Sequence, residues 1–182
     1  MSYIPPVLQI FLALLTLAAG ASDIRTRRIP NLLVLAGAVA GLGMNWFLGG
    51  TPGLAHAAQG LGLALLFYFP LFALRAMGAG DAKLMGAVGS IVGPGNWFGI
   101  FILTAILGGA VGLLVVALRK RVAATVFNVA FIIRELMAFR APYLKREDLQ
   151  AGNENAISLP HGSVIACACL TYIVVVNVWA PR

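Results

Sequence analysis

The sequence predicts an all-α polytopic membrane protein: a bundle of about six transmembrane helices with one further amphipathic helix at the interface. Of its 182 residues, 60% are hydrophobic and only 10% are charged, whereas a soluble domain carries about 25% charged residues. A chain this apolar would expose large hydrophobic patches in water. The net charge of +7 comes from clusters between apolar stretches, a pattern that indicates membrane orientation rather than nucleic-acid binding.

The apolar stretches divide the chain into spans within a single integral-membrane domain, residues 1–182. A polar loop over 22–31, ended by Pro30, separates the first two spans, and an uncharged turn rich in Gly and Pro over 49–53 separates the next two. The predicted spans are approximately 4–21, 32–48, 54–74, 79–93, 97–118 and 162–179.

The fourth span needs a separate explanation because it is short. Its apolar part, 82–92, covers about 16 Å, well below the roughly 30 Å hydrocarbon core. Either the helix begins upstream of Asp81, or it is a partial span packed inside the bundle. We favour a helix that starts near the glycines before Asp81 and is shielded by its neighbours.

Residues 119–160 form the longest segment between spans. Its first half, 122–139, is apolar but interrupted by polar residues and flanked by basic ones, which is typical of a helix lying in the interface. Its second half is polar and is predicted to be a loop.

The basic residues orient the bundle. Twelve of the thirteen Lys and Arg residues fall in the segments 25–28, 75–83 and 119–146, which all lie on one side of a six-span chain. The positive-inside rule places these segments in the cytoplasm and both termini on the outer side. The first six residues hold no basic residue, so we expect the first span to be retained rather than removed as a signal peptide.

Two of the six acidic residues, Asp23 and Asp81, lie at the cytoplasmic ends of the first and fourth spans. Ionisable groups at membrane depth are costly and are functional candidates by default. Two carboxylates in one site cannot both ionise. The ionised one can take a proton from water while the protonated one donates to a carbonyl oxygen, so that water attacks without a covalent intermediate.

Other interpretations of these aspartates remain open at this point. Asp23 lies beside three arginines and can serve as an ion-pair partner or a helix cap. The same two carboxylates can act as a proton relay in a small proton-linked transporter or channel subunit. No acidic residue falls in the predicted outer half of the membrane, which counts against a relay. An assembly scaffold that has lost catalysis is a third possibility.

The residues around both aspartates resemble motifs of a known family. SDIRTRRIPN (residues 22–31) resembles the first aspartate motif of type IV prepilin peptidases, and GAGDAKL (78–84) resembles their second, the GxGD motif. LPHG (159–162) is similar to the Pro-x-Gly element that opens their last span. The short form of the chain looks most like the Tad/CpaA-type enzymes that serve Flp-type pili.

This resemblance implies a membrane aspartic endopeptidase with Asp23 and Asp81 as its catalytic residues. Its substrate would be a prepilin or pseudopilin whose short basic leader is cut on the cytoplasmic side, usually after a glycine. Larger family members carry a cytoplasmic insertion with paired C-x-x-C cysteines and also methylate the new N-terminus. That insertion is absent from the first loop, so we expect peptidase activity and no N-methyltransferase activity.

Five further residues are candidates for shaping the site or binding substrate. Gly78 and Gly80 allow a backbone or substrate strand to pass close to Asp81. Lys83 either keeps one carboxylate ionised or meets lipid phosphate. Pro30 and Asn31 shape the turn and start the second helix.

No cofactor is expected. The two histidines, His56 and His161, fall on opposite sides of the predicted membrane, so they cannot share a metal site. No nucleotide-binding, zinc-protease or serine-hydrolase motif occurs in the sequence. The partners we expect are the prepilin-like substrate and the lipid bilayer, without nucleic acid.

Overall fold

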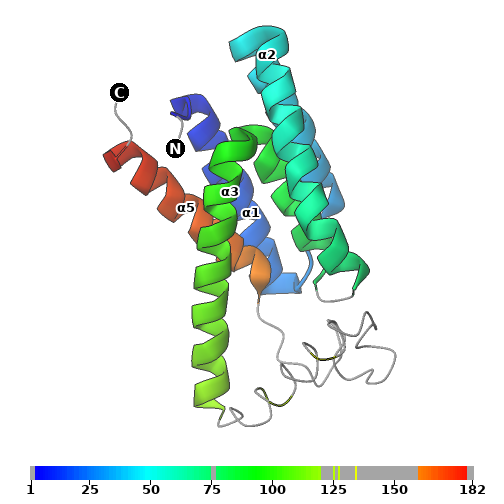
Figure 1. Ribbon diagram of the computed structural model, residues 1–182, viewed down its shortest axis with the longest axis vertical. Helices are drawn as coiled ribbons and strands as arrows, with labels where there is room; N and C mark the ends of the chain where they lie inside the picture. Colours follow the sequence, from blue (N-terminus) through cyan, green and yellow to red (C-terminus); the bar gives the residue numbers. More distant parts are fainter. Residues whose placement is uncertain are drawn as a thin grey trace.

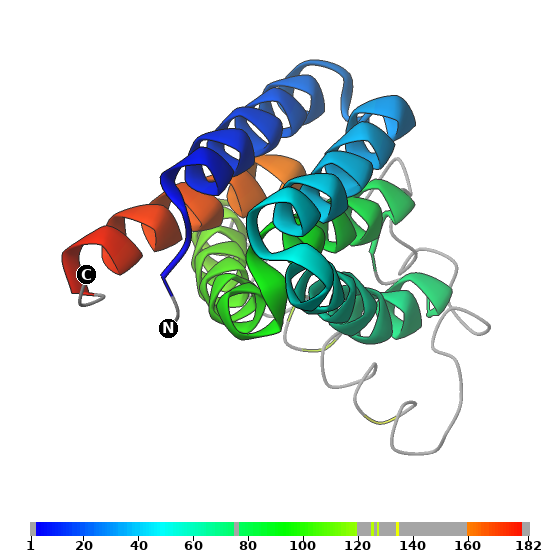
Figure 2. The ribbon, with the colours of Figure 1, turned by 90° about the horizontal axis from the view of Figure 1, so that it is seen from above.

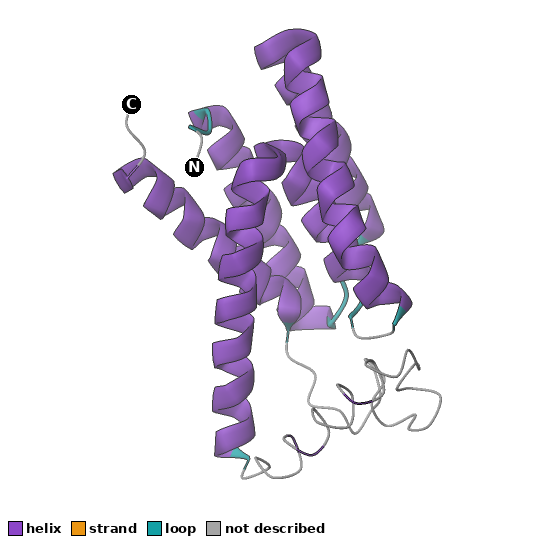
Figure 3. Ribbon diagram, in the orientation of Figure 1, coloured by secondary structure: helices purple, strands orange, loops and turns teal. Residues whose placement is uncertain are grey.

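The protein is a helical bundle in the computed structural model, which describes residues 3–74, 77–119 and 160–179 together with positions 125, 127 and 134. All regular structure in these residues is helical (Figure 3). Each of the four helices is long and apolar enough to cross a membrane. The predicted class, a helical membrane protein, is therefore confirmed. The helices are α1 (Pro6–Thr26), α2 (Asn31–Ala73), α3 (Ala79–Leu118) and α5 (His161–Trp179).

Helix α1 is longer than the sequence predicted. The expected polar loop from residue 22 is wrong, because the helix continues to Thr26. Two hydroxyl groups support this last turn: Thr26 Oγ1 donates to the Ser22 carbonyl at 2.9 Å, and Ser22 Oγ donates to the Arg28 carbonyl at 2.8 Å. Arg27 then ends the helix in a left-handed conformation (φ 53°). Asp23 therefore projects from a helix and not from a loop.

Helix α2 folds back on itself at Gly50. As one straight helix its 43 residues would be about 65 Å long. Instead Gly50 adopts φ 60° and ψ −147°, a region that glycine enters without steric cost, and the two halves of α2 lie side by side (Figures 1 and 2). Val34 and Leu65 consequently line the same cavity. The turn was predicted over 49–53, but in the structure Gly50 is the one residue of α2 with non-helical backbone angles.

Helix α3 bends in the same way at Gly93, which has φ 74° and ψ 175°. Trp97 Nε1 donates to the Met85 carbonyl at 3.2 Å, although residues twelve apart in one straight helix would be separated by about 18 Å. The second half of α3 therefore returns past the first. The first half begins at Ala79 with Gly78 as its N-cap, and it is buried without interruption over 84–93. The predicted start near the glycines and the shielding by neighbours are both confirmed.

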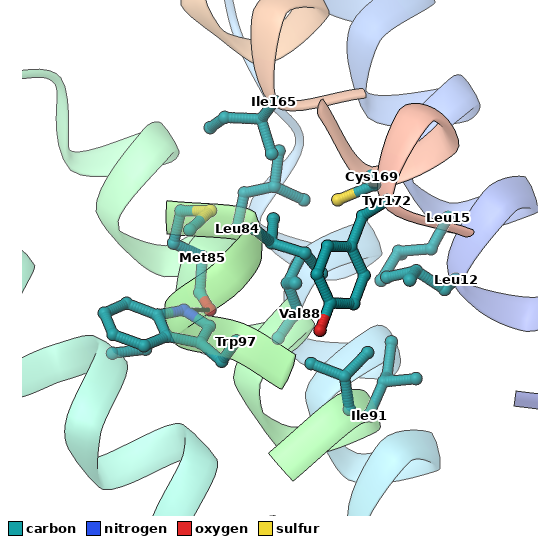
Figure 4. Close-up of a cluster of buried hydrophobic side chains, with 14 of the residues drawn as sticks. Leu12, Leu15, Leu84, Met85, Val88, Ile91, Trp97, Ile165, Cys169 and Tyr172 are labelled. Atoms are coloured by element: carbon teal, nitrogen blue, oxygen red, sulfur yellow. Dashed lines mark hydrogen bonds between the residues drawn. The ribbon is translucent and has the colours of Figure 1, made fainter. Parts of the chain in front are cut away.

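The core forms where the other helices pack around this first half of α3. Figure 4 shows Leu84, Met85 and Val88 of α3 among side chains from α1 and α5. The second half of α2 and the first half of α3 approach each other closely at Gly60 and Gly89, where a Cβ on either glycine would overlap the carbonyl oxygen of the other. This contact requires glycine on both helices.

Polar groups within the bundle find partners on neighbouring helices. Asn45 Nδ2 on α2 donates to the carbonyls of Ser90 and Ile91 on α3, at 3.1 and 3.0 Å. Gln9 of α1 and Asn177 of α5 exchange two side-chain hydrogen bonds. Since polar groups at membrane depth are costly when unpaired, these bonds help to fix how the helices associate.

The outer surface of the bundle is apolar, as a lipid environment requires. Phe47, Leu32 and Trp179 are 89%, 77% and 79% exposed, and large exposed apolar areas of this kind indicate contact with lipid rather than water.

The folding-back of α2 and α3 determines which helix ends lie together. In Figure 1 the end of α1, both ends of α2, and the starts of α3 and α5 lie towards the lower end of the bundle, while the start of α1 and the end of α5 lie towards the upper end. Each of the two bent helices thus supplies two helical halves. Whether all six helical segments cross the bilayer stays a prediction. The predicted interfacial helix over 122–139 and the loop after it lie almost entirely outside the described residues.

Candidate active site

Asp23 of α1 and Asp81 of α3 line one cavity at the lower end of the bundle. The cavity has a volume of about 330 Å³. The two carboxylates are near enough to interact electrostatically, and Asp23 is only 8% exposed. Asp23, Arg27, Arg28, Ile29, Asn31, Gly78, Ala79, Gly80 and Asp81 form the lining.

Asp23 is held in place by the first turn of α5. Its Oδ2 atom accepts a buried hydrogen bond of 2.8 Å from the backbone N–H of Gly162. A Cβ at Gly162 would lie 3.1 Å from both Cβ and Oδ2 of Asp23, and 3.0 Å from Cδ1 of Ile29. Glycine therefore lets the start of α5 approach the carboxylate closely. A free backbone N–H at a helix N-terminus is also a favourable partner for a negative charge.

Asp81 lies in the first turn of α3, three residues after the N-cap Gly78. A Cβ at Gly78 would lie 3.3 Å from Asp81 Oδ2, and one at Gly80 would lie 3.4 Å from Ile29 Cβ. The two glycines of the GxGD motif therefore have different neighbours. Gly78 keeps space beside the carboxylate, and Gly80 keeps space for the link between α1 and α2.

Ile29 is a residue whose importance the sequence did not indicate. Its side chain is half-buried and faces Gly80 of α3 as well as Gly162 of α5. It therefore packs between α3, which carries Asp81, and α5, whose Gly162 N–H donates to Asp23. Its proximity to Pro30 in the first motif was the only available signal.

Tyr68 and His161 also lie near the carboxylates and were not predicted as site residues. Tyr68 is buried in α2, packs against the Trp97 ring with 6.2 Å between the ring centroids, and lies near Asp81. His161 directly precedes Gly162 and lies near Asp23. Both residues belong to apolar helical runs that otherwise look like packing segments.

The remaining predicted residues form the edge of the site. Pro30 is the N-cap of α2 in an extended conformation, and its carbonyl accepts the N–H of Val34 at 3.3 Å. Lys83 Nζ donates to Asn31 Oδ1 at 3.0 Å. Lys83 lines a neighbouring cavity rather than the one that holds the aspartates. Asn31 lines both.

The chemistry available in this cavity is that of two carboxylates in a partly enclosed space. Within the part of the chain that the structure describes, no three His, Cys, Asp or Glu side chains are grouped as metal ligands would be. His56 of α2 lies against Gly93, and His161 of α5 lies near Gly108, so the two histidines contact different parts of α3. A water molecule between the carboxylates is the reactant that this arrangement can activate.

The fold and site together define a class: a helical membrane protein with two acidic side chains from different helices in one cavity near the helix ends. A sequence profile of the type IV leader peptidase family matches residues 10–113, which is more than half of the chain and includes both aspartates. The protein belongs to this family, and it is therefore a peptidase of the leader-peptidase type. No curated protein and no solved structure matches the chain.

Proposed function

We propose that the protein is an aspartic endopeptidase that removes the leader from prepilin-like substrates, with Asp23 and Asp81 as its catalytic residues. The observation that carries this proposal is the shared cavity, in which two carboxylates from separate helices interact at the same end of the bundle. Family membership supplies the reaction class.

The proposed reaction needs no group other than the carboxylates and water. One carboxylate is ionised and takes a proton from the attacking water, while the other is protonated and donates to the carbonyl oxygen of the scissile peptide bond. The tetrahedral intermediate then collapses with proton transfer to the departing amine. Electrostatic interactions within the pair are stronger in a partly buried cavity than in water.

The proposal also covers where and on what the enzyme works. The basic segments at 25–28 and 75–83 flank the two aspartates in the sequence, so the positive-inside rule assigns the cavity to the cytoplasmic face of the bacterial inner membrane and both termini to the periplasm. The substrates would be prepilins or pseudopilins, of which the Flp type fits the short form of the chain. We expect cleavage without N-methylation.

The test is cleavage in reconstituted membranes. The substrate is a prepilin-like polypeptide with a basic leader ending in Gly, followed by an apolar helix. Asp23→Asn and Asp81→Asn should each lower the rate about 100-fold or more, the range of a lost general acid or base. Asp148→Asn makes the same chemical change in the predicted polar loop after residue 139 and should leave the rate near that of the wild type.

Folding of the variants must be shown separately, by insertion into membranes and by a single peak in size-exclusion chromatography. Near-normal cleavage by a folded Asp23→Asn or Asp81→Asn protein would refute the assignment of the pair. Failure of the wild-type protein to cut any prepilin-like substrate would refute the proposed activity itself.

A further inference from the structure

A second cavity, of about 460 Å³, lies between the two halves of α2 and the first half of α3. Its lining is apolar except at one end, where Asn31 and Lys83 are found. We call it the apolar cavity. Asn31, Val34, Leu35, Ala38, Leu61, Leu65, Lys83 and Gly86 line it.

The apolar cavity lies next to the one that holds the aspartates. Asn31 lines both cavities, and its Oδ1 accepts a hydrogen bond of 3.0 Å from Lys83, which lines the apolar cavity. From Asn31 to Ala38 the lining spans eight residues of α2, a rise of about 10 Å along the helix. The apolar cavity therefore extends from the aspartate end of the bundle towards the turn at Gly50.

The walls of the apolar cavity are open to an apolar ligand. Leu35 and Leu65, one from each half of α2, are 63% and 44% exposed, while Val34 behind them is 5% exposed. Gly86 of α3 lets the leucines of the second half of α2 pack closely against this wall: a Cβ there would lie 3.2 Å from Leu61 Cδ1. These side chains leave a recess that hydrophobic groups can occupy with a gain in buried area.

We propose that the apolar cavity binds the side chains that directly follow the scissile bond of the substrate, an inference that rests on the proposed function. A membrane-anchored chain cut between the two aspartates must turn from the helix ends into the hydrocarbon, and the apolar cavity leads in that direction from the shared residue Asn31. About three residues of extended chain cover its 10 Å. The basic leader then remains outside the apolar cavity, on the other side of the aspartates.

The experiment uses two synthetic prepilin-like polypeptides with identical leaders ending in Gly. In one, the first three residues of the apolar helix are Phe-Leu-Leu, and in the other they are Ala-Ala-Ala. Ala38→Phe fills part of the apolar cavity, and Leu35→Ala removes one of its walls. Ala36→Phe and Leu32→Ala make the same changes at exposed positions of the same helix outside the lining.

We expect Ala38→Phe and Leu35→Ala to raise KM for the Phe-Leu-Leu substrate about tenfold, within the range by which an apolar pocket discriminates between side chains. Their kcat should stay unchanged, because a contact made equally in the ground state and the transition state affects KM alone. With the Ala-Ala-Ala substrate, the two cavity variants should change KM less than about twofold, because this substrate has no large side chains to place in the apolar cavity. The two control variants should also change KM less than about twofold, because surface changes away from the binding contacts are nearly neutral.

Three results would overturn the inference. The first is wild-type kinetics for both cavity variants. The second is an equal rise in KM for the two substrates. The third is a rise that depends on whether the vesicles contain anionic or only zwitterionic lipid, since this would identify the occupant of the apolar cavity as lipid. If the wild-type protein cuts neither polypeptide, the proposed function fails first and the inference falls with it, a result distinguishable from the other three.

Discussion

The hydrogen bond between Gly162 and Asp23 allows a quantitative prediction about stability that is independent of catalysis. Asp23 Oδ2 accepts the buried N–H of Gly162 at 2.8 Å. In Asp23→Asn the amide oxygen can accept the same bond, whereas in Asp23→Ala the N–H loses its partner. An unsatisfied buried donor costs about 1–3 kcal/mol, so Asp23→Ala should be less stable than Asp23→Asn by about that amount.

The comparison between the two variants isolates the hydrogen bond. Both remove the ionisable carboxyl group of Asp23, and with it any electrostatic interaction between this group and Asp81, so this effect cancels. Both should also be inactive, so activity does not enter the measurement. The assay is reversible unfolding of the purified variants in mixed micelles, followed by circular dichroism, with equal slopes required for the two transitions.

Equal unfolding free energies for the two variants would refute this reasoning, since they would mean that the Gly162 N–H is not held by residue 23 in the folded protein. A larger loss for Asp23→Asn than for Asp23→Ala would also refute it. A difference near the lower end of the range would indicate that water reaches the N–H once the side chain is shortened, because a bridging water is nearly as good a partner.

Three other predictions follow from close contacts and from topology. Gly162→Ala places a Cβ 3.1 Å from Asp23 Oδ2 and should slow cleavage about tenfold by shifting the carboxylate. Gly109→Ala, where a Cβ meets nothing within 4 Å, should leave the rate unchanged, and equal rates for both would contradict the prediction. The Cβ of Gly60→Ala would overlap the Gly89 carbonyl, so this variant should lower the unfolding free energy by about 1–3 kcal/mol. Gly62→Ala places its Cβ in open space and should leave the unfolding free energy unchanged. A Gly60→Ala protein as stable as the wild type would show that α2 and α3 lie further apart than this contact requires. The orientation can be tested by labelling with a membrane-impermeant maleimide in a Cys167→Ser background. The cysteine of Thr26→Cys should react only in inverted vesicles, and that of Gly49→Cys only in intact cells. The opposite pattern would reverse the proposed orientation.

The helical segments could be predicted from the sequence because their signals are local. Apolar runs longer than about 18 residues indicate spans, and glycine-rich breaks near 50 and 93 mark where they end. The structure agrees, with Gly50 and Gly93 as the non-helical residues inside α2 and α3. The fold-back at these points was implied by the orientation of the basic segments, which required an even number of crossings between them.

The last turn of α1 could not be predicted because charge and hydroxyl groups gave the segment the composition of a loop. Ser22, Asp23 and Thr26 have weak helix preference and ordinarily favour caps and turns, and the arginines beside them make the segment polar. In the structure the hydroxyl groups bond backbone carbonyls within the helix and just beyond it. Hydrogen bonds from Ser and Thr side chains to the backbone usually compete with helix formation, but those of Ser22 and Thr26 support the final turn of α1.

The contacts around the carboxylates could not be predicted because they join residues far apart in the chain. Gly162 and Asp23 are separated by 139 positions, and neither periodicity nor composition connects them. The family motifs did mark both segments, including the Pro-x-Gly element at 160–162. They did so without indicating that the glycine N–H donates to the carboxylate.

The position of Ile29 gives the two aspartates a second connection, besides the direct packing of α1 against α3. Ile29 packs against Gly80 beside Asp81, and it also packs against Gly162, which bonds Asp23. A change in this chain of contacts would alter the separation of the carboxylates without touching either one. Two ionised carboxylates repel each other more strongly as they approach. By setting the separation of Asp23 and Asp81, the link between α1 and α2 therefore determines how strongly the pair favours the state in which it holds one proton. Three small elements — a short link, a glycine motif and a helix N-terminus — therefore define the geometry on which the proposed chemistry depends.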